Sequence, residues 1–162
     1  MKRLLGLLLV MGMVGCGGGE SGNRTGPESE NVAALESENV AALEKLGAKI
    51  KRGVWPDNQP GFSVDLSDTQ VTNADLHLLK ELNSPRYLSL NKTQITDDGL
   101  VHLAELTKLE WLSLHLTPIT NSGIVHLKRL TKLRDLHLSV TLVTDIGIAE
   151  LQEALPNCKI HR

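Results

Sequence analysis

Residues 87–110 read YLSLNKTQITDDGLVHLAELTKLE, and residues 111–134 read WLSLHLTPITNSGIVHLKRLTKLR, with no insertion or deletion between the two copies. Copies with the same spacing stand on either side, at residues 63–86 and 135–158, and residues 159–162 supply a partial last strand. A fixed period of this length indicates supersecondary units that stack, because a single unit cannot bury its apolar face alone. The repeats therefore predict a solenoid.

The first half of each copy predicts a strand. When the first residue of a copy is numbered position 1, positions 2 and 4 are leucine or valine in all four copies, which is the alternation of a strand with one face in the core. Position 7 is always threonine, and a hydroxyl placed where the chain leaves a strand can bond to backbone groups of its own and the next copy. These residues are Thr69, Thr93, Thr117 and Thr141.

The second half of each copy predicts a helix. Position 10 is again threonine and precedes apolar residues at helical spacing, so each of these threonines is a candidate helix N-cap. The four are Thr72, Thr96, Thr120 and Thr144. In the last copy Leu155 falls one place late, which predicts a slightly longer helix end before Cys158.

These positions resemble the leucine-rich repeat family in its bacterial form, L-x-L-x-x-T-x-I-T-D-x-G-L-x-x-L-x-x-L, over residues 63 to about 160 of the repeat region 63–162. The first copy departs from the pattern at Asp75, where the later copies have glycine, and at Pro85, where the next two have leucine. The resemblance implies a fold of the α/β class, a short solenoid with a parallel sheet on its concave side and helices on its convex side.

Residues 29–62 are expected to form an N-terminal cap made of a helix and a lead-in strand. The octapeptide SENVAALE occurs twice in succession, at residues 29–36 and 37–44, with apolar residues on one side of a helix of about four turns. Such a helix would cover the open end of the stack, since an uncovered end repeat exposes its core. A partly helical linker is the alternative. Residues 48–52 alternate apolar and basic, as a short edge strand does.

Residues 1–15 have the features of a signal peptide: Lys2 and Arg3 precede an apolar run that is too short for the roughly 20 residues that span a bilayer. The tetrad Met13-Val14-Gly15-Cys16 resembles the bacterial lipoprotein box, which implies lipidation of Cys16 and anchoring in the cell envelope. Gly17 favours, by the same analogy, the outer membrane, facing the periplasm or the cell exterior. The alternative is an ordinary secretory leader with Cys16 incidental. Residues 16–28 read as a flexible tether.

The composition argues against several classes of protein. A formal net charge of -2 lacks the concentrated basic surface that nucleic-acid binding needs. Two cysteines in unlike settings, Cys16 and Cys158, make a disulfide framework unexpected, and neither stands in the paired Cys/His spacing of structural zinc. The sequence therefore predicts no nucleic-acid partner, no cofactor and no structural metal.

Odd strand positions are expected to face solvent on the concave side. Because neighbouring strands lie about 4.8 Å apart, equal positions form rows across the sheet. One row reads Ser63, Tyr87, Trp111, Asp135 and Lys159. Adjacent Tyr87 and Trp111 are candidate anchors of a binding site, since aromatic residues often dominate interface energy; the alternative is that the rings only cover the rim of the sheet. The polar residues expected to supply selectivity are Asp65, Asn91, His115, Asp135 and His137.

The same face carries residue types that could do chemistry, but their pattern does not favour an enzyme. Ser113, His115 and Asp135 have no accompanying nucleophile-elbow glycines or oxyanion donors. Three histidines with Asp135 have the right types for a metal, yet polar residues collect at solvent-facing positions by default. We therefore predict no enzyme. A metal-dependent hydrolase at the histidines is the remaining catalytic hypothesis.

The sequence as a whole predicts a lipid-anchored leucine-rich repeat protein that binds an unidentified protein partner through its concave sheet. Recognition of an envelope polysaccharide is the alternative, because exposed aromatic rings with serine and asparagine also suit a sugar. The expected membrane contact is through the lipid on Cys16.

Overall fold

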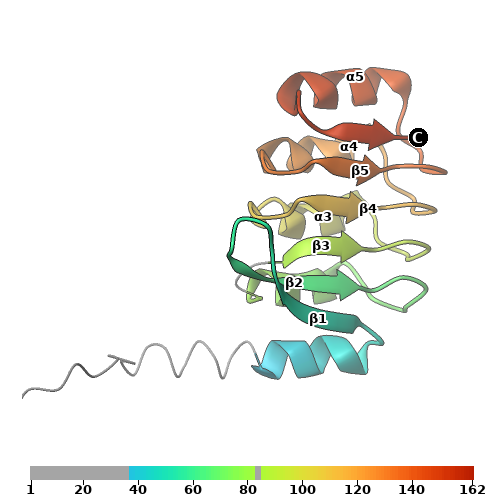
Figure 1. Cartoon of the computed structure of the whole chain (residues 1–162). Coiled ribbons are helices and arrows are strands. Elements are labelled where there is room, and N and C mark those ends of the chain that lie inside the picture. Colours follow the sequence, from blue (N-terminus) through green and yellow to red (C-terminus); the bar gives the residue numbers. More distant parts are fainter. Residues whose placement is uncertain (1–36, 83–84) are drawn as a thin grey trace, which may run out of the picture.

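A computed structural model of the chain describes residues 37–82 and 85–162, which contain one six-stranded sheet in the order β1-β2-β3-β4-β5-β6. The strands are β1 (Lys49–Val54), β2 (Pro60–Asp65), β3 (Pro85–Ser89), β4 (Trp111–Ser113), β5 (Asp135–His137) and β6 (Lys159–His161). β1 pairs antiparallel with β2, and every later pair is parallel. Figure 1 shows the strands stacked along one direction, so each repeat adds one strand to the same edge.

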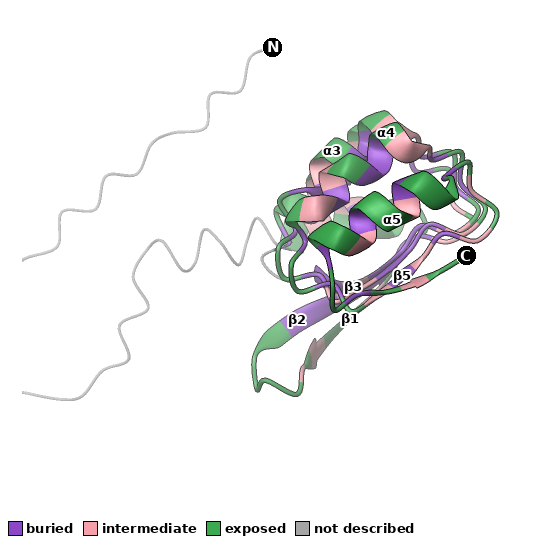
Figure 2. Cartoon of the chain, turned by 90° about the horizontal axis from the view of Figure 1, so that it is seen from above, coloured by how far each residue is buried: buried purple, intermediate pink, exposed green. Residues whose placement is uncertain are grey.

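The helices lie together on one face of this sheet (Figure 2). They are η1 (Ala74–Leu76), α2 (His77–Lys80), α3 (Asp97–Leu103), α4 (Asn121–Ile124), η2 (Val125–Arg129) and α5 (Asp145–Ala154). α3 contacts α4, and α4 contacts α5. The longest is α5, as expected from the late Leu155. The opposite face of the sheet carries no helix among the described residues, and we call it the open face.

The strand register confirms the repeat. Tyr87 pairs with Trp111, Trp111 with Asp135, and Asp135 with Lys159, so a shift of one strand is a shift of 24 residues. The expected fold, an α/β leucine-rich repeat solenoid with a parallel sheet on one side and helices on the other, is therefore confirmed.

The core is a continuous aliphatic layer between the sheet and the helices. Positions 2 and 4 of every repeat are buried, and the helix leucines meet them from the other side. The strand residues in this layer are Val64, Leu66, Leu88, Leu90, Leu112, Leu114, Leu136 and Leu138. Full burial of one such side chain contributes about 1.5–3 kcal/mol. Cys158 belongs to the same layer, and burial raises the pKa of its thiol to about 11, so it acts as a core residue.

The two threonine rows were predicted correctly only in part. At position 7 each threonine hydroxyl donates to the carbonyl three residues earlier, as Thr93 does to Leu90 at 2.7 Å. These bonds stay within one repeat. The predicted bond to the next repeat was therefore wrong for the described residues. At position 10, Thr120 and Thr144 cap their helices through the side chain, whereas Thr96 stands at the N-cap position without a side-chain capping bond. Thr72 does not stand at an N-cap position, because η1 begins after Asn73.

The N-terminal part of the solenoid is described from residue 37. Residues 37–45 are helical, and Leu43 is fully buried in the core. β1 lies where a lead-in strand was expected, and a hairpin returns the chain into β2. The first SENVAALE copy, the tether and the leader lie outside the described residues. Within residues 37–82 and 85–162, no helix has both the length and the apolar character needed to cross a membrane.

Candidate functional site

Four rings form a row on the open face, and we call it the ring row: Tyr87, Trp111, His137 and His161. Tyr87 and Trp111 stack with centroids 4.0 Å apart and planes 7° apart. His137 and His161 stack at 4.3 Å and 9°. Trp111 joins the two pairs by a tilted contact with His137 at 5.1 Å. The row therefore crosses the strands of four successive units.

The path of the ring row differs from the row that equal positions alone predict. Tyr87 and Trp111 occupy position 1, whereas His137 occupies position 3 of its repeat. Trp111 therefore meets a ring diagonally across the sheet and not its register partner Asp135. Diagonal neighbours on one face lie within reach of aromatic side chains.

Stacking decides which atoms the ring row shows to solvent. Between Tyr87 and Trp111, and between His137 and His161, one face of each ring is covered by its neighbour. Ring edges therefore line the row, with a phenol hydroxyl, an indole and imidazole nitrogens, while the stack with Trp111 covers one face of Tyr87. A stacked aromatic pair contributes about 0.5–1.5 kcal/mol beyond the area it buries. Each ring is held by its neighbours before any ligand arrives.

The predicted polar residues all lie on strands or strand exits of the open face, but their groups differ in availability. Asn91 Oδ1 already accepts from Ser113 Oγ and from the His115 backbone N–H at 3.1 Å. His115 Nδ1 lies 3.0 Å from the carbonyl of Ser139. These two residues tie neighbouring repeats together. Asp65 accepts a bond from the Ser67 N–H at 3.0 Å.

The environment of the ring row disfavours protonation of His137. Burial lowers the pKa of His137 below its ordinary value of 6.5, and the neighbouring His161 lowers it further, against a smaller opposing effect of Asp135. His161 Nε2 lies 3.3 Å from Asp135 Oδ1. Among residues 37–82 and 85–162, no group of three or more His, Cys, Asp or Glu side chains is arranged to hold a metal ion.

The serine, histidine and aspartate of the open face bond to different partners. Ser113 is buried and donates to Asn91, His115 contacts a backbone carbonyl, and Asp135 contacts His161. The three side chains therefore do not form a nucleophile, base and orienting acid in sequence.

A second row, which sequence reasoning missed, lies at the turn between strand and helix. The position-11 residue of one repeat binds the position-10 threonine of the next through two bonds, one to its backbone N–H and one to its hydroxyl. Asn73 binds Thr96 at 3.0 and 2.7 Å, Asp97 binds Thr120 at 2.8 and 2.5 Å, and Asn121 binds Thr144 at 2.9 and 2.8 Å. We call these three residues the clamp row.

The clamp row explains the glycine at position 13. A Cβ on Gly123 would lie 2.9 Å from Asp97 Cγ and 3.0 Å from its Cα, and a Cβ on Gly147 would lie 2.6 Å from Asn121 Cγ. Real Cβ atoms essentially never approach so closely, so the glycine makes room for the preceding clamp residue. In the first repeat Asp75 stands there and instead accepts from the N–H and hydroxyl of Thr72. The signal was present in the sequence as Asn or Asp two residues before glycine.

The sequence matches no family model and no curated protein. Among solved structures, it is similar to a leucine-rich repeat protein of Leptospira interrogans, at 20% identity and a TM-score of 0.43, over 53% of this chain and 21% of that one. It is also similar to the leucine-rich repeat ectodomain of the receptor kinase SOBIR1 from Arabidopsis thaliana, at 12% identity and a TM-score of 0.44, over 79% of this chain and 91% of that one. The chain thus spans about a fifth of the length of the Leptospira protein.

Proposed function

We propose that this chain is a lipid-anchored binding module that holds a partner protein against the ring row on its open face. The observation that carries the proposal is the ring row itself, with Tyr87 and Trp111 stacked at 4.0 Å on a sheet built from successive repeats. Rigid aromatic residues with a polar rim are enriched where proteins bind each other. Asp65, Asp135 and His137 supply polar groups beside the rings.

The geometry favours a protein partner over the alternative, an envelope polysaccharide. A sugar packs its C–H groups against the open face of an aromatic ring, whereas Trp111 is covered by Tyr87 on one side and meets His137 on the other. Ring edges with hydroxyl and N–H groups suit backbone carbonyls and carboxylates of a protein. Sedimentation of the protein with purified sacculi, lost on Trp111→Ala, would favour the polysaccharide instead.

The binding test uses the full-length chain and a double variant. Tyr87→Ala with Trp111→Ala removes both anchors and is expected to abolish capture of a native partner from the cell envelope. His102→Ala with His126→Ala, on the helix side, is the matched control and should capture normally. Equal capture by the Tyr87/Trp111 variant and by the unaltered chain, with both folded by circular dichroism, would overturn the site.

The proposed anchor has its own test, independent of the open face. Cys16 follows an apolar leader in a tetrad that resembles the lipoprotein box, and two or more acyl chains give stable attachment to a bilayer. Cells fed a clickable fatty acid should label the chain and retain it in the membrane fraction, and Cys16→Ser should abolish both. Cys158→Ser is the matched control, since that thiol is buried. Labelling that survives Cys16→Ser would contradict the anchor.

A further inference from the structure

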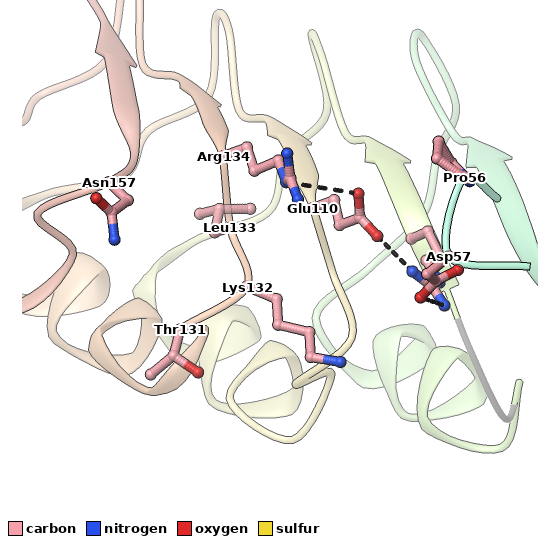
Figure 3. A pocket seen from close by; sticks show the side chains of 9 residues that line it. Pro56, Asp57, Glu110, Thr131, Lys132, Leu133, Arg134 and Asn157 are labelled. Carbon is pink, nitrogen blue, oxygen red and sulfur yellow. Dashed lines mark hydrogen bonds and ion pairs between the residues drawn. The ribbon is translucent and has the colours of Figure 1, made fainter. Parts of the chain in front are cut away.

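A groove of about 570 Å³ lies where strands begin, lined by residues that directly precede Tyr87 and Trp111 but by neither of these rings. One wall is the β1–β2 hairpin, with Pro56 and Asp57, and the other is the segment 131–134 with Asn157 (Figure 3). Arg86 and Glu110 lie between the walls. A volume of this size is in the range of sites for small molecules.

The hairpin wall is fixed by a buried arginine. Arg86 is only 3% exposed, donates to Asp57 Oδ2 at 2.7 Å and to Glu110 Oε1, and has its guanidinium 5.9 Å from the ring of Trp55. A buried charge is costly unless it is paired. These contacts connect the hairpin to the sheet over 29 residues of sequence. The groove therefore has a preformed shape.

The same contacts determine where the groove carries positive charge that no carboxylate balances. Arg86 pairs with both Asp57 and Glu110, and its single positive charge balances only one of the two carboxylates. Arg134 and Lys132 add two positive charges, so these five side chains together carry one net positive charge. On the other wall, Arg134 is 78% exposed and only 3.9 Å from its nearest acid, Glu110. Within the described part of the chain Lys132 has no ion pair. The excess positive charge thus lies on the Lys132–Arg134 wall, beside the neutral donors Thr131 and Asn157.

We propose that this groove binds a small ligand through a single oxyanion, a carboxylate or a phosphate, held by Lys132 and Arg134. A guanidinium binds such groups through two parallel N–H bonds, and an ammonium adds a point charge. Asp57 on the hairpin wall and Glu110 between the walls disfavour a ligand with many negative charges, because together they carry one more negative charge than Arg86 balances. The groove is separate from the ring row, so the proposal does not depend on the proposed partner site.

The test is an NMR titration of the ¹⁵N-labelled full-length chain at constant ionic strength. The probes are inorganic phosphate and acetate, with chloride as the reference anion. Phosphate, acetate or both are expected to give saturable shifts at residues 131–134 and 157 that chloride does not give, and the more effective probe identifies the oxyanion. Shifts that do not saturate, or that spread evenly over exposed basic residues, would overturn the proposal.

Two charge-matched variants separate a site from general attraction. Lys132→Gln with Arg134→Gln is expected to weaken probe binding by about tenfold or more, because charge-assisted bonds are lost. Lys128→Gln with Arg129→Gln removes the same charge from η2 and should leave binding unchanged. Equal weakening by the two charge variants would contradict a site in the groove.

Discussion

The ring row and the clamp row both follow from the 24-residue period, but the residue types are similar at each step of the clamp row and differ along the ring row. In the clamp row an Asn or Asp makes the same pair of bonds to the next threonine at every repeat junction from Asn73 to Thr144. On the open face, position 1 changes from Ser63 to Tyr87, Trp111 and Asp135. The clamp row thus holds neighbouring units together with one residue type pattern, whereas position 1 of the open face carries a different side chain in each repeat.

The physical reason is that a solenoid is stabilised by contacts between nearest neighbours. A clamp residue bonds to the backbone N–H of the next repeat, and every repeat has that group whatever its side chains are. The open face is not covered by the helices (Figure 2), and its bonds between repeats, such as that from Ser113 to Asn91, depend on the side chains that are present. Substitutions in the clamp row are therefore expected to reduce stability, and substitutions in the ring row are expected to reduce binding.

The largest effect is expected at the glycine that faces a clamp residue. Gly123→Ala should lower the free energy of unfolding by about 2–3 kcal/mol, since the new methyl group overlaps Asp97. Urea denaturation followed by circular dichroism measures it. Combining Gly123→Ala with Asp97→Ala should cost less than the sum of the two single changes, because the smaller side chain makes room. If the two changes in unfolding free energy were strictly additive, glycine at position 123 would not be explained by the clamp residue Asp97.

Removing one clamp should cost less. Asn73→Ala eliminates two bonds to Thr96 and is expected to destabilise the chain by about 1–2 kcal/mol. Asp145 stands at the same position of the last repeat but is exposed and pairs with Arg162, so Asp145→Ala should change stability by about 0.5 kcal/mol at most. If urea denaturation gave similar losses of unfolding free energy for the two variants, the clamp residue would be no more stabilising than a surface carboxylate.

The ring row should contribute little to stability by comparison. A double-mutant cycle of Tyr87→Ala and Trp111→Ala is expected to give a coupling of about 1 kcal/mol, the value typical of a stacked pair. The same cycle on Tyr87 and Asp135, which are two strands apart, should give almost none. A coupling above that of the Gly123–Asp97 pair would mean that the rings serve mainly to hold the stack.

The smallest effect is a dependence on pH. The pKa of His137 is lowered in the folded chain, so the unfolded chain takes up the proton more readily. The contribution of neutral His137 to the free energy of unfolding is therefore fully present above pH 6.5, and we expect it to fall as the pH drops below that value. His137→Gln should remove this part of the dependence, and His102→Gln, on the helix side, should not. An unchanged pH profile for His137→Gln would place the effect elsewhere.

The period alone predicted the strands, their register and the buried positions, because a repeated apolar alternation leaves few other ways to pack. It also predicted that Tyr87 and Trp111 would be neighbours. It did not predict the contact between Trp111 and His137, because this contact runs diagonally across the sheet and does not join equal positions of two repeats. The pairing of Arg86 with Asp57 was missed because it joins the hairpin to the repeats, and the period of 24 does not relate those two segments. Arg86 and Glu110 do stand 24 residues apart, at the last position of successive repeats, but an apolar pattern does not reveal an ion pair there.

Site-specific photo-crosslinking in intact cells tests most directly the claim that the varying face is the one that binds. A benzophenone side chain at Ser63, which pairs in register with Tyr87, is expected to give adducts of higher mass with a partner protein. Adding Tyr87→Ala with Trp111→Ala should remove these adducts, and the same label at His126 on the helix side should give none. Adducts from His126 alone, or adducts at Ser63 that survive loss of both rings, would contradict the account.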